Sequence, residues 1–160
     1  MLLRGGIVFS VFSVAFMAAP AMAGVDLAAA DACIQGRIEA GKPVLECIEA
    51  ASADCAANGP EASSTAAVCF REVRDGWSAG IKGLLDKVGA TGSDDIATIA
   101  AIEVKYDILT GLLQCDRMEE LAKAVSDQSA EVILRQKSQC EAAASGNAYA
   151  RLFWRSRDVK

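Results

Sequence analysis

Residues 55–88 read CAANGPEASSTAAVCFREVRDGWSAGIKGLLDKV, and this stretch decides the expected fold. Its Asn-Gly-Pro segment at 58–60 is typical of a break between helices, and Ser63 or Ser64 can cap the helix that follows. From there to about Val88, apolar residues recur at helical spacing on one face, namely Cys69, Val73, Trp77, Ile81, Leu84 and Val88. The stretch therefore predicts a long amphipathic helix with a cysteine near its start.

The flanking regions have the same helical character. Alanine is abundant, proline is absent after residue 60, and no segment alternates at period two as a strand would. We expect a first helix from Asp26, as N-cap, to about Ala40. A second helix should begin at Pro43, after the break at 41–43, and run to about residue 57.

The second half of the chain predicts further helices. Ser93 can cap a helix that follows the break at 89–92, and Asp94 and Asp95 suit its positive end. This helix is apolar nearly all round, so we expect it to be the most buried element. The helical pattern continues through Ile133, and Gly146-Asn147 should interrupt it before a short terminal helix. The expected fold class is all-α.

Six cysteines, at positions 33, 47, 55, 69, 115 and 140, allow fifteen pairings, and the predicted helices favour one. Cys47 and Cys55 lie on one predicted helix, roughly 12 Å apart, which is beyond disulfide reach. The pairs 33–47 and 55–69 each straddle a predicted break symmetrically, so each can join two antiparallel helices. The remaining pair, 115–140, then requires a turn near 126–129, where Ser-Asp-Gln-Ser suits one. The resulting fold is a small antiparallel bundle of helical hairpins stapled by disulfides.

Residues 1–23 have the layout of a secretory signal peptide. One basic residue, Arg4, precedes an apolar run of about 12 residues, and small residues allow cleavage after Ala23. The alternative is an uncleaved interfacial helix. The run is too short to span a bilayer comfortably. We therefore expect a periplasmic or secreted protein without stable membrane insertion, in which residues 24–160 form a single domain.

Composition excludes several classes of function. The chain has no histidine, which excludes Ser-His-Asp and Cys-His catalysis and histidine-ligated zinc or haem. Its formal charge is −5, and removal of residues 1–23 makes it −6, so a nucleic-acid partner is not expected. An even cysteine count in an exported chain favours structural disulfides over a metal or redox site, and no CxxC motif is present. We expect no cofactor and no metal.

A few residues are candidates for a site. Glu72 and Trp77 are candidate partner-binding residues, but Trp77 also suits the core and Glu72 also suits a solvated helix face. The glycines at 76, 80 and 83 indicate either close approach of another helix or a groove for a partner. The adjacent carboxylates at 94–95 and 119–120 point apart on a helix, so we expect solvated charges rather than acid–base chemistry. Near the end of the chain, Phe153 is expected in the core, and Trp154 is assigned to neither core nor surface.

A family resemblance rests on the residues around the second cysteine pair. Cys55, the loop 58–65, Cys69, Glu72 and Trp77 resemble the N-terminal motif of LprI-like lysozyme inhibitor proteins. The string at 47–55 looks like an extended form of this motif, and Cys115 and Cys140 fall where the family's second cysteine pair would. The resemblance spans residues 33–152. Residues 107–115 depart from it, because they lack the aromatic residue and Arg-Asp that the family usually carries before its third cysteine.

The resemblance implies a binding protein rather than an enzyme. Its implied partner is a lysozyme or another basic cell-wall hydrolase, which an acidic protein would attract. The alternative is a structural or assembly module of the cell envelope that binds a different protein and has no link to lysozyme. An enzyme that uses only carboxylates is a third possibility, because lack of histidine does not exclude it.

Overall fold

The computed structural model describes residues 24–157 and residue 159. The predicted signal peptide lies outside the described residues. The described part is all-α, with no strand in it, as the sequence predicts. Its elements are α1 (Leu27–Glu39), α2 (Leu45–Ala50), α3 (Ala53–Ala56), the 3₁₀ helix η1 (Pro60–Ala62), α4 (Ser63–Thr91), α5 (Asp94–Val125) and α6 (Ala130–Ser156).

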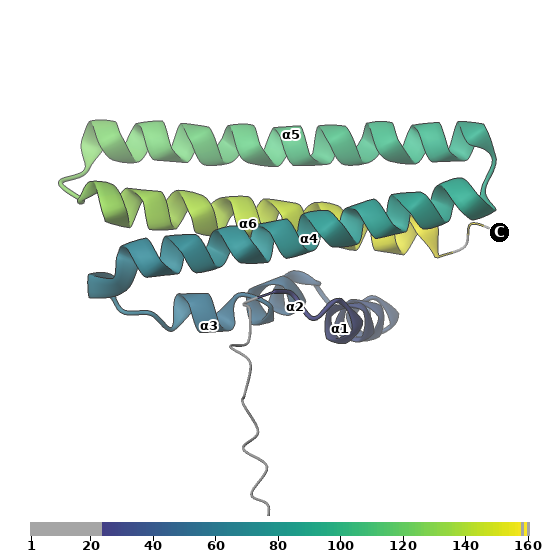
Figure 1. Cartoon of the computed structure of the whole chain (residues 1–160), viewed down its shortest axis with the longest axis horizontal. Coiled ribbons are helices and arrows are strands. Elements are labelled where there is room, and N and C mark those ends of the chain that lie inside the picture. The colour runs from purple at the N-terminus through teal and green to yellow at the C-terminus, as the bar shows by residue number, and fades with distance from the viewer. Residues whose placement is uncertain (1–23, 158, 160) are drawn as a thin grey trace, which may run out of the picture.

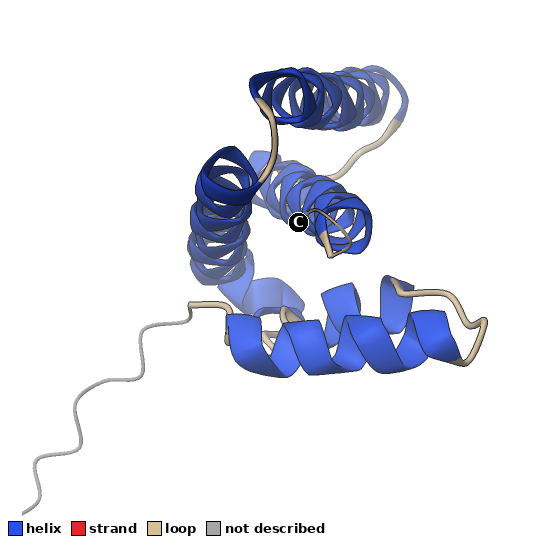
Figure 2. Ribbon diagram, turned by 90° about the vertical axis from the view of Figure 1, so that its right-hand side faces the viewer, coloured by secondary structure: helices blue, strands red, loops and turns tan. Residues whose placement is uncertain are grey.

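The helices form three layers (Figure 1). The long helices α4 and α6 make the middle layer and share the most extensive packing in the molecule. Helix α5 lies along one side of this pair, and the short helices α1 to α3 lie on the opposite side. Figure 2 looks along the long helices and shows that α1 runs across them rather than along them. The core therefore sits between the middle layer and the short helices.

Large apolar side chains of α4 and α6 build this core. Phe70 and Trp77 of α4 are fully buried, and Tyr149 and Leu152 of α6 are buried against the same cluster. Ile34 from α1, together with Cys47 and Ile48 from α2, completes it from the opposite layer. The amphipathic pattern in residues 55–88 thus has the predicted role, with its apolar face in the core.

Several predicted boundaries are confirmed. Asp26 is the N-cap of α1, and its carboxylate accepts a hydrogen bond from the Ala29 amide at 3.0 Å. Ser93 caps α5 in the same way through the Ile96 amide. The chain turns at 126–129, between α5 and α6, where the pair 115–140 requires a turn.

All three predicted disulfides are present. Cys33–Cys47 joins α1 to α2 with a Cα–Cα distance of 5.8 Å, and Cys55–Cys69 joins α3 to α4 at 5.4 Å. Cys115–Cys140 joins α5 to α6 at 5.7 Å. No cysteine is left free. The bundle of hairpins stapled by disulfides is therefore the observed architecture.

The prediction of one continuous second helix, from Pro43 to about residue 57, is wrong. Residues 45–56 form two short helices, α2 and α3, with a turn at 51–52. The Ser52 amide and hydroxyl both donate hydrogen bonds to the Glu49 carbonyl, which closes this turn. The break lets Cys47 face α1 while Cys55 faces α4. The premise that Cys47 and Cys55 share one continuous helix is therefore incorrect, although the pairing drawn from it is present.

Two other expected helix ends are also wrong. Ser63 does not cap α4 through its side chain, because its hydroxyl donates backwards to the Pro60 carbonyl at 2.7 Å. Gly146-Asn147 does not interrupt α6, which is continuous from Ala130 to Ser156. The Asn147 side chain donates to the Ala143 carbonyl one turn earlier, and Gly146 packs directly against α2 and α4. Tertiary packing therefore overrides the local break signal.

The largest correction concerns α5, which is the least covered of the long helices. Only Val104 and Cys115 are buried among its 32 residues. It contacts α6 and, less extensively, α4, and no described element covers its other side (Figures 1 and 2). An apolar sequence on all faces therefore did not produce a central helix, because the described part of the chain has too few other helices to surround it.

Candidate functional site

The two predicted partner-binding residues lie on different faces of α4. Trp77 is fully buried, and its indole N–H has no hydrogen-bond partner among the described residues. Glu72 is exposed on the same helix. The structure therefore does not bring them together on one surface. Trp77 is placed where the core interpretation expects it, whereas Glu72 is accessible to a partner.

Trp77 belongs to an aromatic cluster at the centre of the molecule. Its ring centroid lies 5.1 Å from that of Tyr149, which lies 6.3 Å from that of Phe153. Gly80 makes room for this cluster, because a Cβ atom there would lie 2.7 Å from the Tyr149 ring. Gly76 is similarly close to Val25, so close approach explains these two glycines, whereas Gly83 faces open space.

The end of α6 divides between core and surface. Phe153 is partly buried and packs against the core, as expected. Trp154 is 39% exposed, and the guanidinium of Arg157 lies 3.2 Å from its ring centroid. This cation–π contact covers one face of the Trp154 ring.

Tyr149 of α6 also forms a hydrogen bond to α1. Its hydroxyl donates a hydrogen bond of 2.5 Å to the carboxylate of Asp31. Burial, and then the hydrogen bond to Asp31, raise the pKa of Tyr149 well above its ordinary value. The neutral phenol therefore contributes stability below its ordinary pKa of about 10, and this contribution is lost as the pH rises further.

We expect Tyr149→Phe to lower the free energy of unfolding by about 1.5 kcal/mol at pH 7, because the half-buried Asp31 carboxylate loses its donor. The difference between the two proteins should shrink above about pH 10, because the phenol of the unfolded wild type begins to lose its proton there while the folded one keeps it, which favours unfolding. Urea unfolding at pH 7 and at pH 11 measures both effects. Tyr106→Phe is the matched control, since Tyr106 is 60% exposed. An equal loss in both variants would contradict this role for Tyr149.

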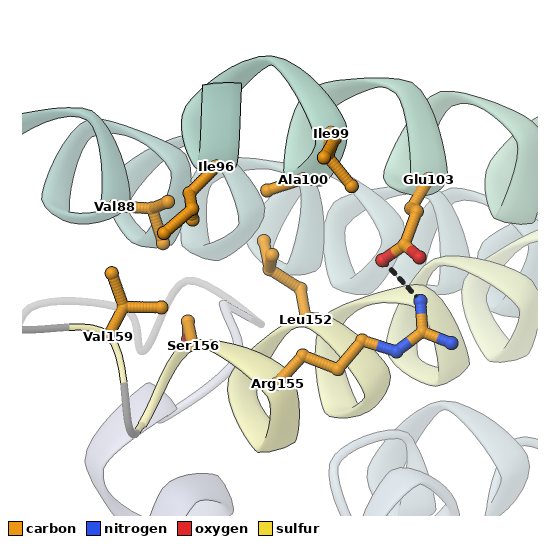
Figure 3. A pocket seen from close by; sticks show the side chains of 9 residues that line it. All are labelled: Val88, Ile96, Ile99, Ala100, Glu103, Leu152, Arg155, Ser156 and Val159. Carbon is orange, nitrogen blue, oxygen red and sulfur yellow. Dashed lines mark hydrogen bonds and ion pairs between the residues drawn. The ribbon is translucent and has the colours of Figure 1, made fainter. Parts of the chain in front are cut away.

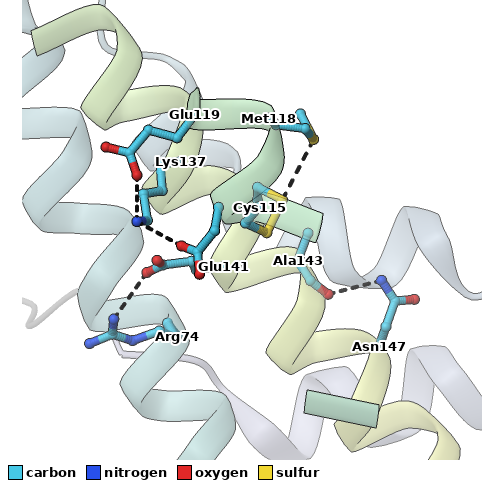
Figure 4. Close-up of a disulfide and its surroundings, with 10 residues drawn as sticks. Arg74, Cys115, Met118, Glu119, Lys137, Glu141, Ala143 and Asn147 are labelled. Atoms are coloured by element: carbon cyan, nitrogen blue, oxygen red, sulfur yellow. Dashed lines mark hydrogen bonds and ion pairs between the residues drawn. A yellow bond between two sulfur atoms is a disulfide. The ribbon is translucent and has the colours of Figure 1, made fainter. Parts of the chain in front are cut away.

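Of the carboxylates at 119–120, Glu119 lies beside the third disulfide in a charged network (Figure 4), whereas Glu120 is exposed. The Lys137 ammonium lies 2.8 Å from Asp116 and 2.5 Å from Glu119, and these two partners raise its pKa. Hydrogen bonds from Lys123 and Lys137 lower the pKa of Glu119. A carboxylate held ionised by two lysines is poorly suited to general acid catalysis.

This network joins helices rather than forming a reaction centre. Arg74 of α4 contacts Glu141 of α6 at 3.1 Å, close to the Cys115–Cys140 bond (Figure 4). Asp94 and Asp95, the other adjacent pair, are exposed at the start of α5. Among the described residues, no group of three or more potential ligands could hold a metal ion. No described helix is long and apolar enough to cross a membrane.

One surface of the molecule is unusually apolar, and it lies on α5. Nine of the thirteen exposed large apolar residues in the described chain belong to this helix. Five of them recur at helical spacing along α5: Ile99, Ile102, Tyr106, Leu109 and Leu113, with exposures of 46–60%. The two end members, Ile99 and Leu113, also line hollows shared with α6. We call these five residues the α5 outer stripe. Contiguous exposed apolar surface of this kind marks interaction sites in soluble proteins.

A small apolar hollow adjoins one end of the α5 outer stripe (Figure 3). It lies between the end of α4, the start of α5 and the end of α6, and its volume is about 140 Å³. Ile96 and Leu152 line it, and the ion pair between Glu103 and Arg155 closes one edge. It is smaller than the roughly 300 Å³ that drug-sized ligand sites usually offer. The hollow therefore suits an apolar side chain of a partner better than a separate ligand.

The negative charge of the protein is concentrated in the layer of short helices. Residues 24–62 carry seven acidic and two basic side chains, a net charge of −5, whereas residues 63–160 carry a net charge of only −1. We call residues 24–62 the acidic layer. Glu39, Glu49 and Asp54 are exposed in it, and the disulfides 33–47 and 55–69 hold it in place. The short helices of the acidic layer and helix α5, which carries the α5 outer stripe, lie on opposite sides of the molecule (Figures 1 and 2).

Comparison with protein-family models, curated proteins and solved structures gives no match for this chain.

The sequence patterns do not predict either surface feature as a site. The net charge of the whole chain does not locate the negative charge, whereas a count by element places it in residues 24–62. The apolar pattern of residues 94–125 predicts core rather than surface for the α5 outer stripe. Its signal is present in the sequence, because three long helices packed in this way can cover only one side of a helix that is apolar all round.

Proposed function

We propose that this chain is an exported, disulfide-stapled binding protein whose acidic layer binds a basic protein partner. The concentration of nearly the whole net charge in residues 24–62 carries this proposal. The predicted signal peptide supports export. The three disulfides support it as well, because disulfides persist in oxidising compartments outside the cytosol. The partner class that fits best is a lysozyme or another basic cell-wall hydrolase, to which the resemblance to LprI-like inhibitors also leads.

Electrostatics explains how the acidic layer would act. Like charges grouped on one side of a protein create a field that steers an oppositely charged partner and orients it before contact. Helices α2 and α3 have only six and four residues, so the two disulfides fix carboxylates that would otherwise be on mobile peptide. A preordered surface binds with a smaller loss of conformational entropy. Exposed Glu72 on α4 is a further candidate contact.

A second function is favoured by a different observation. The α5 outer stripe is apolar and carries no part of the acidic layer, so it suits an assembly role in the cell envelope without any link to lysozyme. The two functions predict that the partner binds different surfaces of this chain. They can therefore be separated by substitution on one side of the molecule at a time.

The test is a binding titration of the oxidised mature chain with a basic lysozyme at low salt. Glu49→Gln/Asp54→Asn should weaken binding at least tenfold, because two exposed carboxylates of the acidic layer are removed. Glu120→Gln/Asp127→Asn is the matched control, with the same change in charge on two exposed residues outside that layer. Binding should also weaken as salt is raised, since salt screens exposed charges. Equal weakening by both variants would contradict a specific role for the acidic layer.

A further inference from the structure

We propose that two copies of this chain associate through the α5 outer stripe, with the two α5 helices antiparallel. This inference does not rest on the proposed function, because it concerns the opposite side of the molecule. The evidence comes from the spacing of the stripe, its charges and its length.

The α5 outer stripe has the spacing of a helix-pairing seam. Its members at positions 99, 102, 106, 109 and 113 are separated by three, four, three and four residues. This is the a/d repeat of a coiled coil, in which each apolar side chain inserts between side chains of a second helix. Within the described chain, no helix lies against this side of α5 (Figures 1 and 2). The seam is therefore open to a helix from another molecule.

The pattern is symmetric about its own centre, which favours a second copy as the occupant. Ile99 and Leu113 lie seven residues on either side of Tyr106, and Ile102 and Leu109 lie four and three residues from it. A two-fold axis near Tyr106 would therefore place apolar residues of one copy opposite apolar residues of the other. A two-fold interface needs this kind of self-complementary surface.

Charges at the ends of the stripe set the direction. Asp95 lies four residues before the first member of the stripe, and Arg117 lies four residues after the last. Both are therefore eleven residues from Tyr106. Both are exposed, and no ion pair holds either of them within the described chain. Antiparallel pairing places Asp95 of each copy near Arg117 of the other, whereas parallel pairing places two Asp95 carboxylates together. The two Lys105 side chains would meet at the exposed rim, where solvent screens their repulsion.

The size of the stripe predicts a moderate affinity. Its five residues span about 21 Å of helix, so the pair would bury less surface than a standard stable interface. Ile96 and the adjoining hollow extend the apolar surface at one end. We therefore expect a dimer that forms reversibly in the micromolar range rather than a permanent one.

Sedimentation velocity of the oxidised mature chain over a range of concentrations tests the proposal. The wild type should shift from monomer to dimer as concentration rises. Tyr106→Glu/Leu109→Glu should remain monomeric, because it places carboxylates in the apolar seam. The variant should still fold, since both residues are about half-exposed in the monomer. Leu45→Glu/Val68→Glu, which changes two comparably exposed apolar residues away from α5, should dimerise as the wild type does.

The charges at the ends test the direction of pairing. Asp95→Arg and Arg117→Asp should each weaken the dimer several-fold, and the double exchange should restore it, because the antiparallel pair is then re-formed with reversed signs. Circular dichroism of each variant checks that the helices are intact. A wild type that is monomeric at every concentration overturns the proposal. A dimer that forms equally well after the stripe substitutions overturns it as well. Single charge exchanges that leave the dimer affinity unchanged overturn the antiparallel arrangement.

Discussion

Removing the Cys115–Cys140 disulfide will let α5 separate from the other helices before they unfold. Only Val104 and Cys115 of this helix are buried, so little apolar surface holds it in place. Two of its ion pairs to α6, from Asp107 to Arg151 and from Glu103 to Arg155, involve half-exposed arginines and contribute little, and the pairs from Lys137 to Asp116 and Glu119 lie beside the disulfide. We therefore expect the disulfide, whose cysteines are 25 positions apart, to contribute most to holding α5 in place.

The variant Cys115→Ala/Cys140→Ala should lose about 3 kcal/mol of unfolding free energy, since the unfolded chain regains the freedom of the closed loop. Hydrogen exchange followed by mass spectrometry, at a protein concentration low enough to keep the chain monomeric, locates the effect. Amides of α5 should exchange much faster, while those of α4 and α6 stay protected.

Cys33→Ala/Cys47→Ala is the matched control for this result. It opens a different loop, so it should speed exchange in α1 and α2 and leave α5 as it is in the wild type. If loss of Cys115–Cys140 accelerates exchange equally in all helices, α5 is not a separately attached layer, and the description of its packing is wrong.

Gly146→Ala will destabilise the protein although alanine is the better helix former. A Cβ atom at this position would lie 2.7 Å from Cγ2 of Ile48 and 3.0 Å from Nε1 of Trp77. Both neighbours are fully or almost fully buried and cannot move aside freely. We expect a net loss of about 1–3 kcal/mol, the usual cost of overpacking a core.

The control for this prediction is Gly83→Ala on α4, where an added Cβ atom meets nothing within 4 Å. This substitution should stabilise the protein by up to about 1 kcal/mol, the ordinary gain from replacing glycine in a helix. Chemical denaturation of the two variants beside the wild type measures both signs. A stabilising Gly146→Ala would show that α2 and α4 do not approach α6 as closely as described.

The parts of the fold that the sequence predicts well are those fixed by local chemistry. Asp26 and Ser93 cap helices because their side chains reach amides one turn away. The disulfide pairs follow because two helices joined by a short break place equidistant residues at the same height. Composition and breaks are local properties, and the all-α class follows from them.

The errors arise where distant residues decide the outcome. Gly146 has the residue type of a helix break, but Trp77, nearly seventy positions earlier, occupies the space beside it, and α6 stays continuous. The burial of α5 depends on how many helices surround it, which its own pattern does not encode. Trp77 and Glu72 belong to the same short sequence motif, yet the helix places Trp77 in the core and Glu72 on the surface.

The candidate surfaces show the same division. The charge of residues 24–62 can be counted from the sequence, but only the packing of α1 to α3 on one side of the molecule makes it a surface. The heptad spacing of the α5 outer stripe is also visible in the sequence. Its exposure is not, because the same spacing would serve equally well in a core.

The central claim is that the acidic layer binds a basic cell-wall hydrolase, and the most direct measurement is inhibition of that enzyme. Hydrolysis of a cell-wall substrate by a basic lysozyme is followed at low salt with increasing amounts of the oxidised mature chain. We predict inhibition at micromolar concentrations, less inhibition by Glu49→Gln/Asp54→Asn, and none after reduction of the disulfides. Undiminished hydrolysis at every concentration of the chain would contradict the account.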